Sequence, residues 1–482
     1  MKSKRSFINA GILRNDIKSM GWIGAAYLLG LLLSVPLQIL MIYSRQETMV
    51  LNVLNNPYLR IFKFQVDLQM LLLLVVPVLT GIFLFRYLQS SQTVDMMHTL
   101  PIKREILYNT HLTAGFIFLF VPIIITALVS WAIINGLGIE YVSNQAIFTW
   151  LGLSLIINLL LFVTSVATGM FCGMSTVQGV LTYTLLLLPA GLSMLLLHNI
   201  NLYTYGFAYD YYLNKFNNIS PLIRMTQLNY HPFSATEIGL YLFSSLVLYL
   251  AGLYLYQRRH LETAGNAITF AVIRPIFKYG VTFCSMLCVG SYFYSAQHSM
   301  NWTYFGYVLG SLLGYWLSEF LMNKSLHVFK KKITRGYLVF VVVMIVLISG
   351  FNYDFTGYEK KLPELAQVES VFWNNSFFNL PGGERNQAAY DYESQNDRYT
   401  RKVSMEYSNP QNIAHIYKLH QAIIANREQE KAAAFVNNEY NSRQNLFFVY
   451  KLKNGSMIYR QYNVNVNQYA AQLKPIYESL ER

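Results

Sequence analysis

Nine apolar stretches constrain the fold of this chain more than any other feature of its sequence. Most approach the roughly 20 residues that a helix needs to cross a bilayer. Only 13% of the residues are charged, against about a quarter in a soluble domain. Backbone polar groups inside lipid must be satisfied within the protein, which favours helices, so we predict an all-α polytopic membrane protein of about nine spans. The spans are expected near residues 21–44, 66–88, 112–135, 149–172, 178–199, 239–257, 280–296, 304–322 and 337–351.

The distribution of Lys and Arg sets the expected orientation of these spans. With the N-terminus inside the cell, the inside segments hold 17 Lys and Arg residues, and the outside segments before residue 352 hold 5. Such an excess is typical of the cytoplasmic side. We therefore predict a cell-membrane protein with a cytoplasmic N-terminus and an extracellular C-terminal domain. The net charge of +13 then reflects membrane insertion and requires no nucleic-acid partner.

The inside loop between the second and third predicted spans, residues 86–111, is the strongest candidate for a functional segment. Val94, Met97 and Leu100 fall on one helical face. Pro101 suits the first turn of a new helix, where its missing N–H costs nothing. A short amphipathic helix between two spans is either a handle for a soluble partner or a plain connector. The candidate contact residues are Val94, Met97, Leu100, Pro101, Lys103, Arg104 and Glu105.

A second inside segment follows the sixth predicted span and reads YQRRHLETAGNAITF, residues 256–270. Arg258 and Arg259 are typical anchors on the inner side of a membrane. Glu262 is placed to pair with either arginine along one helical turn. Gly265 is expected to end that helix.

Two further segments are expected at the membrane surface. Residues 1–20 are basic and amphipathic, which favours a helix lying in the headgroup region; the alternative is a basic start that only orients the first span. Residues 200–238 are rich in Tyr and Phe. They predict either an aromatic belt at the membrane boundary or a pair of surface or re-entrant helices that lines an exit path.

Residues 352–482 are polar and predict a small α+β domain on the outer face. A helix is expected to begin at Pro410, with Ile413, Ile416, His420 and Ile423 on one side. Asn454-Gly455 lies between FFVYKL and SMIYRQY, which is typical of a β-hairpin. A last helix is expected over residues 467–480, and we interpret residues 375–410 as a mobile loop.

Catalytic and metal-binding patterns are missing from the sequence. It contains no phosphate-binding loop of the GxxxxGK[ST] kind, no HExxH and no GxSxG. Ionisable residues are almost absent from the predicted spans, which argues against an ion-driven carrier. His415 and His420 share a helical face poorly, and the three cysteines lie in or beside apolar runs, where packing is their expected role. We therefore predict a chain that is not an enzyme and binds no metal or cofactor.

Several motifs resemble permease subunits of bacterial exporter-type ABC transporters. TLPIKREILYNTHLTAG, with SSQTVDMM before it, resembles the loop after the second span of these permeases. YQRRHLETAGNAITF is similar to the segment after the sixth span in one Gram-positive branch, and LPELAQVESV, VYKLKNG and LKPIYESLE are similar to the outer domain of that branch. The resemblance implies a six-span permease core with an N-terminal elbow helix over residues 1–257, a cytoplasmic linker with three further spans over 258–351, and an extracytoplasmic domain over 352–482.

The resemblance also implies a division of labour between subunits. Two permeases, as a homodimer or a related heterodimer, would form the pathway, while separate cytosolic ATPase subunits would bind and hydrolyse ATP with Mg. Segment 92–105 would insert into a cleft on the ATPase, with Met97 and Leu100 in an apolar notch and Arg104 paired with an acid at its rim. Residues 200–238 would form an outer helical hairpin.

The expected function is ATP-driven export of an amphipathic cargo, such as an antimicrobial peptide, a lipid-linked molecule or another cell-envelope compound, with a contribution to antibiotic resistance. Two alternatives come from other classes. One is a membrane sensor or scaffold for cell-envelope stress whose outer domain binds a ligand; the other is a polytopic envelope enzyme. A cytosolic ATPase that copurifies with the chain would favour the exporter.

Overall fold

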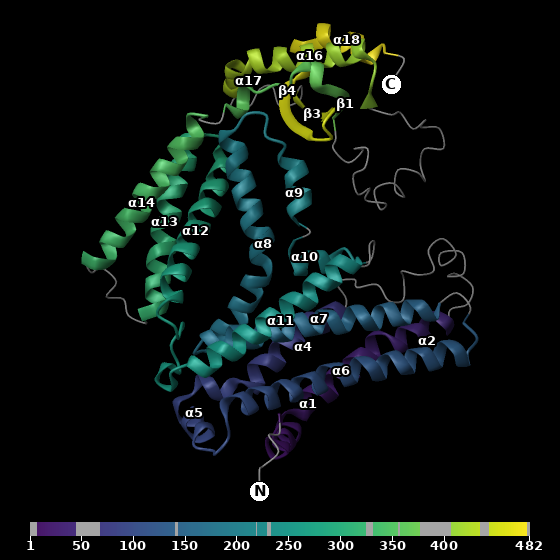
Figure 1. The fold of residues 1–482 in the computed structure, drawn as a ribbon, viewed down its shortest axis with the longest axis vertical. Coiled ribbons are helices and arrows are strands. Elements are labelled where there is room, and N and C mark those ends of the chain that lie inside the picture. The colour runs from purple at the N-terminus through teal and green to yellow at the C-terminus, as the bar shows by residue number, and fades with distance from the viewer. Residues whose placement is uncertain are drawn as a thin grey trace. The chain divides into compact units, whose positions relative to one another are not determined.

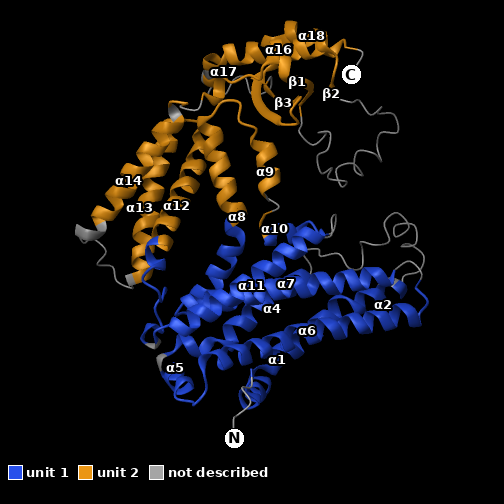
Figure 2. Cartoon of the chain, viewed as in Figure 1, with its two compact units in different colours: residues 1–188, 221–275 blue, residues 189–220, 276–482 orange. Residues whose placement is uncertain are grey.

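The computed structural model describes residues 7–44, 68–139, 143–217, 219–228, 233–323, 331–354, 357–375, 406–433 and 443–479. Within these ranges the chain is mostly helical, with one small antiparallel sheet near the C-terminus (Figure 1). It divides into two units. The first holds residues 1–188 and 221–275, and the second holds residues 189–220 and 276–482 (Figure 2).

Seven helices of the described residues are long and apolar enough to cross a membrane, which indicates a membrane-spanning protein. They are Ala10–Met41 (α1 with α2), Arg104–Gly136 (α6), Asn144–Phe171 (α7), Ser175–Tyr203 (α8), Ala235–Arg258 (α11), Ile273–Gln297 (α12) and Thr334–Phe351, which lies within α14, Lys331–Asn352. The remaining two predicted spans also lie on helices. Of these, α4, Leu68–Leu84, is shorter, and α13, Met300–Asn323, is long enough but less apolar.

The expected elbow and the first predicted span form one continuous helix over the described residues. This helix, α1, Ala10–Ser34, begins after Asn9, whose side chain accepts hydrogen bonds from the N–H groups of Gly11 and Ile12 at 2.9 and 3.2 Å. Pro36 follows its end and opens α2, Pro36–Ser44. Asp16 is buried against α6, with its Oδ2 2.7 Å from Nδ1 of His111. One side of residues 10–20 thus packs against the first unit, and the other side is exposed.

The helices of the first unit meet at close range through small side chains. The helices α1, α4, α6 and α7 pack against one another, and α11 packs against α7. A Cβ added to Gly115 of α6 would lie 2.1 Å from the ring of Phe162 of α7, so a glycine is required for this approach. Tyr27 of α1 donates to Oδ1 of Asn158 of α7 at 3.1 Å, which satisfies both polar groups inside the bundle.

In the second unit α12, α13 and α14 lie side by side (Figure 1). Glycines recur every four residues on α13 where it faces α12, and a Cβ on Gly310 would lie 2.5 Å from the carbonyl oxygen of Ser285. Lys278 of α12 and Glu319 of α13 form an ion pair with 2.8 Å between Nζ and Oε1. Glu319, which lies in the predicted span 304–322, is therefore paired within the protein.

The C-terminal domain is an antiparallel sheet of strand order β2-β1-β3-β4. Its strands are β1, Val368–Asn374, β2, Glu406–Tyr407, β3, Arg443–Leu452, and β4, Met457–Asn465. Its helices are α16, Pro410–Ala425, α17, Arg427–Ala433, and α18, Ala470–Tyr477. The helices α16 and α18 lie beside the sheet (Figure 1). Their apolar side chains share a core with one face of it.

Two local predictions for this domain are confirmed. The helix α16 begins at Pro410 and buries Ile413, Ile416 and Ile423 against the sheet. The β3–β4 hairpin turns at Asn454-Gly455, where Gly455 adopts a φ of +80°, a conformation that suits glycine. The last helix is shorter than predicted, because a 3₁₀ turn over Val466–Tyr469 precedes α18. Of the predicted loop 375–410, residues 376–405 lie outside the described residues.

The opposite face of the sheet contacts α9, Tyr209–Asn217, a helix from much earlier in the chain. The ring of Tyr211 stacks on Tyr459 of β4 with 3.8 Å between centroids. The N–H of Asp210 donates to Oε1 of Gln461 at 3.0 Å, and Nε2 of Gln461 donates back to Oδ2 of Asp210 at 2.7 Å. Two short helices, α9 and α10, Pro221–Thr226, lie within residues 200–238, and Tyr211 of α9 lies against the sheet.

Candidate functional site

The predicted contact segment forms a short helix, α5, Ser91–His98, after a 3₁₀ turn over Arg86–Gln89. The expected continuation to Leu100 is wrong, because α5 ends at His98 with Thr99 as its C-cap. The expected place of Pro101 in a first helical turn is also wrong, because α6 begins at Arg104 with Lys103 as its N-cap. Proline disfavours a helical conformation in the residue before it, which separates α5 from α6.

The two faces of α5 differ in burial, and the outward face was only partly predicted. Val94 is 1% exposed and Met97 packs against the core of the first unit. Met96 is 64% exposed and Leu100 is 41% exposed. Val94 therefore cannot contact a partner as predicted. Met96 was missed because spacing alone fits both faces of so short a helix.

Arg104 is partly buried and bonds to the end of α11. Its Nη1 donates to the carbonyl oxygens of Tyr256, Gln257 and Arg259 at 3.3, 3.0 and 3.0 Å. The carbonyls that end a helix have no intrahelical partner, so Arg104 caps α11. Beside it, Glu105 accepts a hydrogen bond from Nε2 of Gln257 at 3.0 Å. The expected ion pair between Arg104 and an acid of a partner is therefore not supported, and the exposed Lys103 is the cation that remains outward.

Arg259 performs the same task at the end of α7. Its Nη1 donates to the carbonyl oxygens of Gly169 and Met170 at 2.7 and 3.0 Å, and its Nη2 donates to that of Leu88 at 2.8 Å. The side chain is 3% exposed, and burial lowers the pKa of its guanidinium to about 10, which leaves it charged at neutral pH. Arg259 thus joins α7 to the turn before α5.

The other predictions for residues 256–270 are corrected by the local backbone. The helix α11 ends at Arg258, whose guanidinium lies over the Tyr254 ring at 4.5 Å. Glu262 lies in an exposed 3₁₀ turn and has no ion pair with either arginine among the described residues. Gly265 does not end α11. It turns the chain with a φ of +83° and donates its N–H to the Gly173 carbonyl at 2.8 Å.

This return segment is bound to the turn between α7 and α8. Gly173 donates its N–H to the carbonyl of Asn266 at 2.8 Å, and Thr269 donates to the carbonyl of Phe171 at 2.9 Å. A Cβ on Gly173 would lie 2.5 Å from the Asn266 carbonyl oxygen, so glycine is required there. At the start of α8, Ser175 and Gln178 bond to Gln89.

A chain of hydroxyl and imidazole groups links α5 to the end of α11 and to the turn before α5. Nδ1 of His98 lies 2.8 Å from the Val94 carbonyl oxygen, and its Nε2 lies 3.4 Å from the hydroxyl of Tyr256. Tyr256 in turn lies 3.0 Å from the hydroxyl of Tyr87. Burial lowers the pKa of His98, so its ring is neutral at pH 7. We use the name α5 junction for this region. It comprises α5, residues 86–89 and 99–105, and the ends of α7 and α11 that are bound to them.

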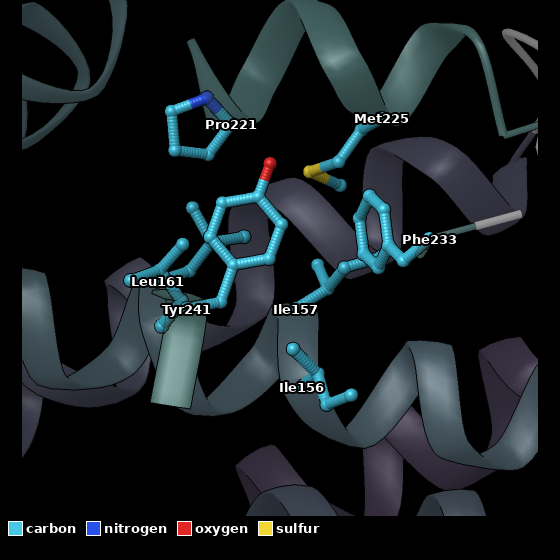
Figure 3. Close-up of a pocket in the computed structure, with 8 residues that line it drawn as sticks. Ile156, Ile157, Leu161, Pro221, Met225, Phe233 and Tyr241 are labelled. Atoms are coloured by element: carbon cyan, nitrogen blue, oxygen red, sulfur yellow. The ribbon is translucent and has the colours of Figure 1, made fainter. Parts of the chain in front are cut away.

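An apolar pocket in the first unit offers no chemistry of its own. It is lined by α7, α10 and the start of α11, and the side chains of Met225, Phe233 and Tyr241 point toward one another (Figure 3). It has room for about one water molecule. The described residues also contain no cluster of His, Cys, Asp and Glu that could hold a metal ion.

The comparisons with known proteins identify no family for this chain. No family model, no curated protein and no solved structure matches this chain. The function is therefore argued from the α5 junction and the sequence.

Proposed function

We propose that this chain is the membrane-spanning permease subunit of an ATP-driven exporter, moved by separate ATPase subunits that bind the outward face of α5. One observation carries the proposal. The exposed Met96 and Leu100 lie on a segment that is hydrogen-bonded to residues at the end of α11 and, through Arg259, to the end of α7. The helix α6 begins a few residues after this segment.

The bonding pattern supports transmission of force. Arg104 and Arg259 together make six hydrogen bonds to backbone carbonyls, and charge-assisted hydrogen bonds are the strong ones. Because five of these carbonyls lie at the ends of α7 and α11 and the sixth, that of Leu88, lies just before α5, a displacement of α5 would be passed to several apolar helices at once. A plain connector between α4 and α6 needs no such bonding.

The remaining parts of the proposal come from the sequence. The excess of 17 Lys and Arg over 5 supports α5 on the cytoplasmic side and the C-terminal domain outside the cell. The absence of a phosphate-binding loop supports ATP hydrolysis in another subunit. We further propose a pathway formed by two permeases and an amphipathic cargo, as the resemblance implies.

The test is copurification of a cytosolic ATPase with the tagged full-length chain from its native membranes, at matched expression. We expect Met96→Asp and Leu100→Asp to reduce the bound ATPase about tenfold or more, because central apolar anchors of an interface are worth about 2 kcal/mol or more. Lys103→Ala should have a mild effect, because rim charges contribute little. The matched control is Met457→Asp, at a methionine that is 45% exposed in the β3–β4 hairpin.

Two results would contradict the proposal. One is an ATPase that binds the Met96→Asp and Leu100→Asp variants and is stimulated by them as by the parent chain. The other is full biological activity in cells that lack every ATPase able to bind the chain, which would favour the sensor.

A further inference from the structure

Arg460 of β4 is a buried arginine whose hydrogen bonds are incomplete. Its side chain is 3% exposed and stacks on the ring of Tyr358, with 3.6 Å from Cζ to the ring centroid. Its Nη2 donates to the carbonyl oxygen of Lys361 at 3.0 Å. Its Nε and Nη1 have no hydrogen-bond partner within the described part of the chain.

The buried acids nearby are engaged with other cations. Lys431 donates to both carboxylate oxygens of Glu359 at 2.8 Å, and Oε1 of Glu359 also accepts from the Tyr205 N–H at 2.8 Å. Glu430 pairs with Arg443 at 2.8 Å and accepts from the Tyr469 hydroxyl at 3.1 Å. Among the described residues, Arg460 therefore has no carboxylate partner.

A buried guanidinium without a counter-charge destabilises the folded domain unless another group supplies the missing hydrogen bonds and negative charge. A guanidinium stays charged in proteins, and a buried charge without a counter-charge is strongly disfavoured. The remaining N–H groups of a planar guanidinium match the oxygens of a carboxylate or phosphate. Burial, and then the charge of Arg460, lower the pKa of His420 to about 3, so the neighbouring imidazole is neutral.

We propose that the Arg460 guanidinium is the binding site for an oxyanion, a carboxylate or phosphate group of a ligand that the C-terminal domain receives. The ring of Tyr358 covers one face of this guanidinium. Tyr358 lies in a 3₁₀ turn, Tyr358–Lys360, and is half-buried. The carboxylate of Asp354 holds this turn by accepting from the N–H groups of Tyr358 and Glu359 at 2.9 and 3.2 Å. A rotation of the Tyr358 ring admits an anion without unfolding the sheet.

The experiment is hydrogen–deuterium exchange on the full-length chain in maltoside micelles, which carry no phosphate or carboxylate. The probes are inorganic phosphate and acetate, with chloride at equal ionic strength as the reference. We expect phosphate, acetate or both to slow exchange severalfold in peptides that cover residues 357–361 and 458–462. Phosphatidylglycerol nanodiscs in chloride form a further arm, in which the same protection would identify a lipid headgroup as the source of the phosphate.

The variants separate binding from folding. Arg460→Met should lose the protection while its thermal unfolding midpoint stays equal or rises, because removal of an unpaired buried charge relieves its desolvation cost. Arg460→Lys keeps the charge without the planar fork and should bind more weakly. Arg427→Met, at a surface arginine of α17 paired with the exposed Glu428, should respond like the parent.

Three outcomes would overturn the proposal. The first is no protection of the parent chain by either anion. The second is the same protection in Arg460→Met, which would place the anion elsewhere. The third is a large drop in the unfolding midpoint of Arg460→Met, which would make Arg460 a structural residue of the folded domain.

Discussion

Two arginines of this protein are buried to the same degree and behave differently. Arg259 and Arg460 are each 3% exposed. The guanidinium of Arg259 donates to three backbone carbonyls, two at the end of α7 and one before α5. Arg460 bonds to one carbonyl and a tyrosine ring and keeps two nitrogens without a partner among the described residues.

The comparison shows that hydrogen bonding, and not burial alone, distinguishes the two buried arginines. A guanidinium saturated by helix-end carbonyls needs no acid, because those carbonyls lack intrahelical donors and carry the negative end of the helix dipole. Arg259 is thus part of the architecture of the α5 junction. An unsaturated guanidinium costs stability in the protein alone, a cost that is typical of residues kept for function.

The largest expected effect is the loss of Arg259. In Arg259→Met three buried carbonyls lose their donor, which should lower the free energy of unfolding by about 3–5 kcal/mol. The measurement is thermal unfolding of the full chain in detergent, with hydrogen exchange of residues 263–269. Arg258→Met, one residue earlier and exposed, is the matched control and should change little. Equal stability of the two variants would break the comparison with Arg460.

A pH dependence centred on His420 is the next largest effect. Its Nδ1 and Nε2 lie 2.8 and 2.7 Å from the hydroxyls of Tyr450 and Tyr462. Burial, then Arg460, lowers its pKa to about 3, below the ordinary value of about 6.5. The unfolded chain therefore binds the proton first. This contribution to stability is complete above about pH 6.5 and is lost as the pH falls toward 3.

Between pH 7 and pH 5 the loss should reach about 2 kcal/mol. It is measured as the free energy of opening of β3 by native-state hydrogen exchange in the full chain. His420→Gln should remove this dependence, and His415→Gln on the same helix should keep it. An unchanged pH slope in His420→Gln would show that the imidazole is not the titrating group.

The smallest expected effect concerns the contact between α9 and the sheet. A double-mutant cycle with Tyr211→Leu and Tyr459→Leu should give a coupling of about 1 kcal/mol, as for other stacked aromatic pairs. The cycle is read from hydrogen exchange of β4 in the full chain. A coupling near zero would mean that α9 only lies beside the sheet and contributes nothing to its stability.

Much of the fold followed from local patterns. The apolar stretches, the helix beginning at Pro410 and the hairpin at Asn454-Gly455 were predicted, because hydrophobic periodicity and turn chemistry act within a few residues. For the candidate site, the sequence predicted only where in the chain it lies. Residues 86–111 were identified, yet Val94 was assigned to the wrong face, and Met96 was missed.

The missed features share a physical cause. A helix of two turns has apolar residues on both sides, and its inward face is chosen by the surface against which it packs. Arg104 reaches carbonyls 152 to 155 positions away, and Leu88 lies 171 positions from Arg259. Carbonyl acceptors carry no sequence signal, since every residue has one.

By itself the sequence determined that this chain is a helical membrane protein with a polar C-terminal domain, because apolar length and composition decide what lipid accepts. The tertiary structure alone decided which side of α5 faces outward and that Arg104 and Arg259 bind helix ends. It also decided that α9 packs on the sheet, where Asp210 bonds to Gln461 of β4, 251 positions later in the chain. Each of these depends on groups that meet only after the helices have packed.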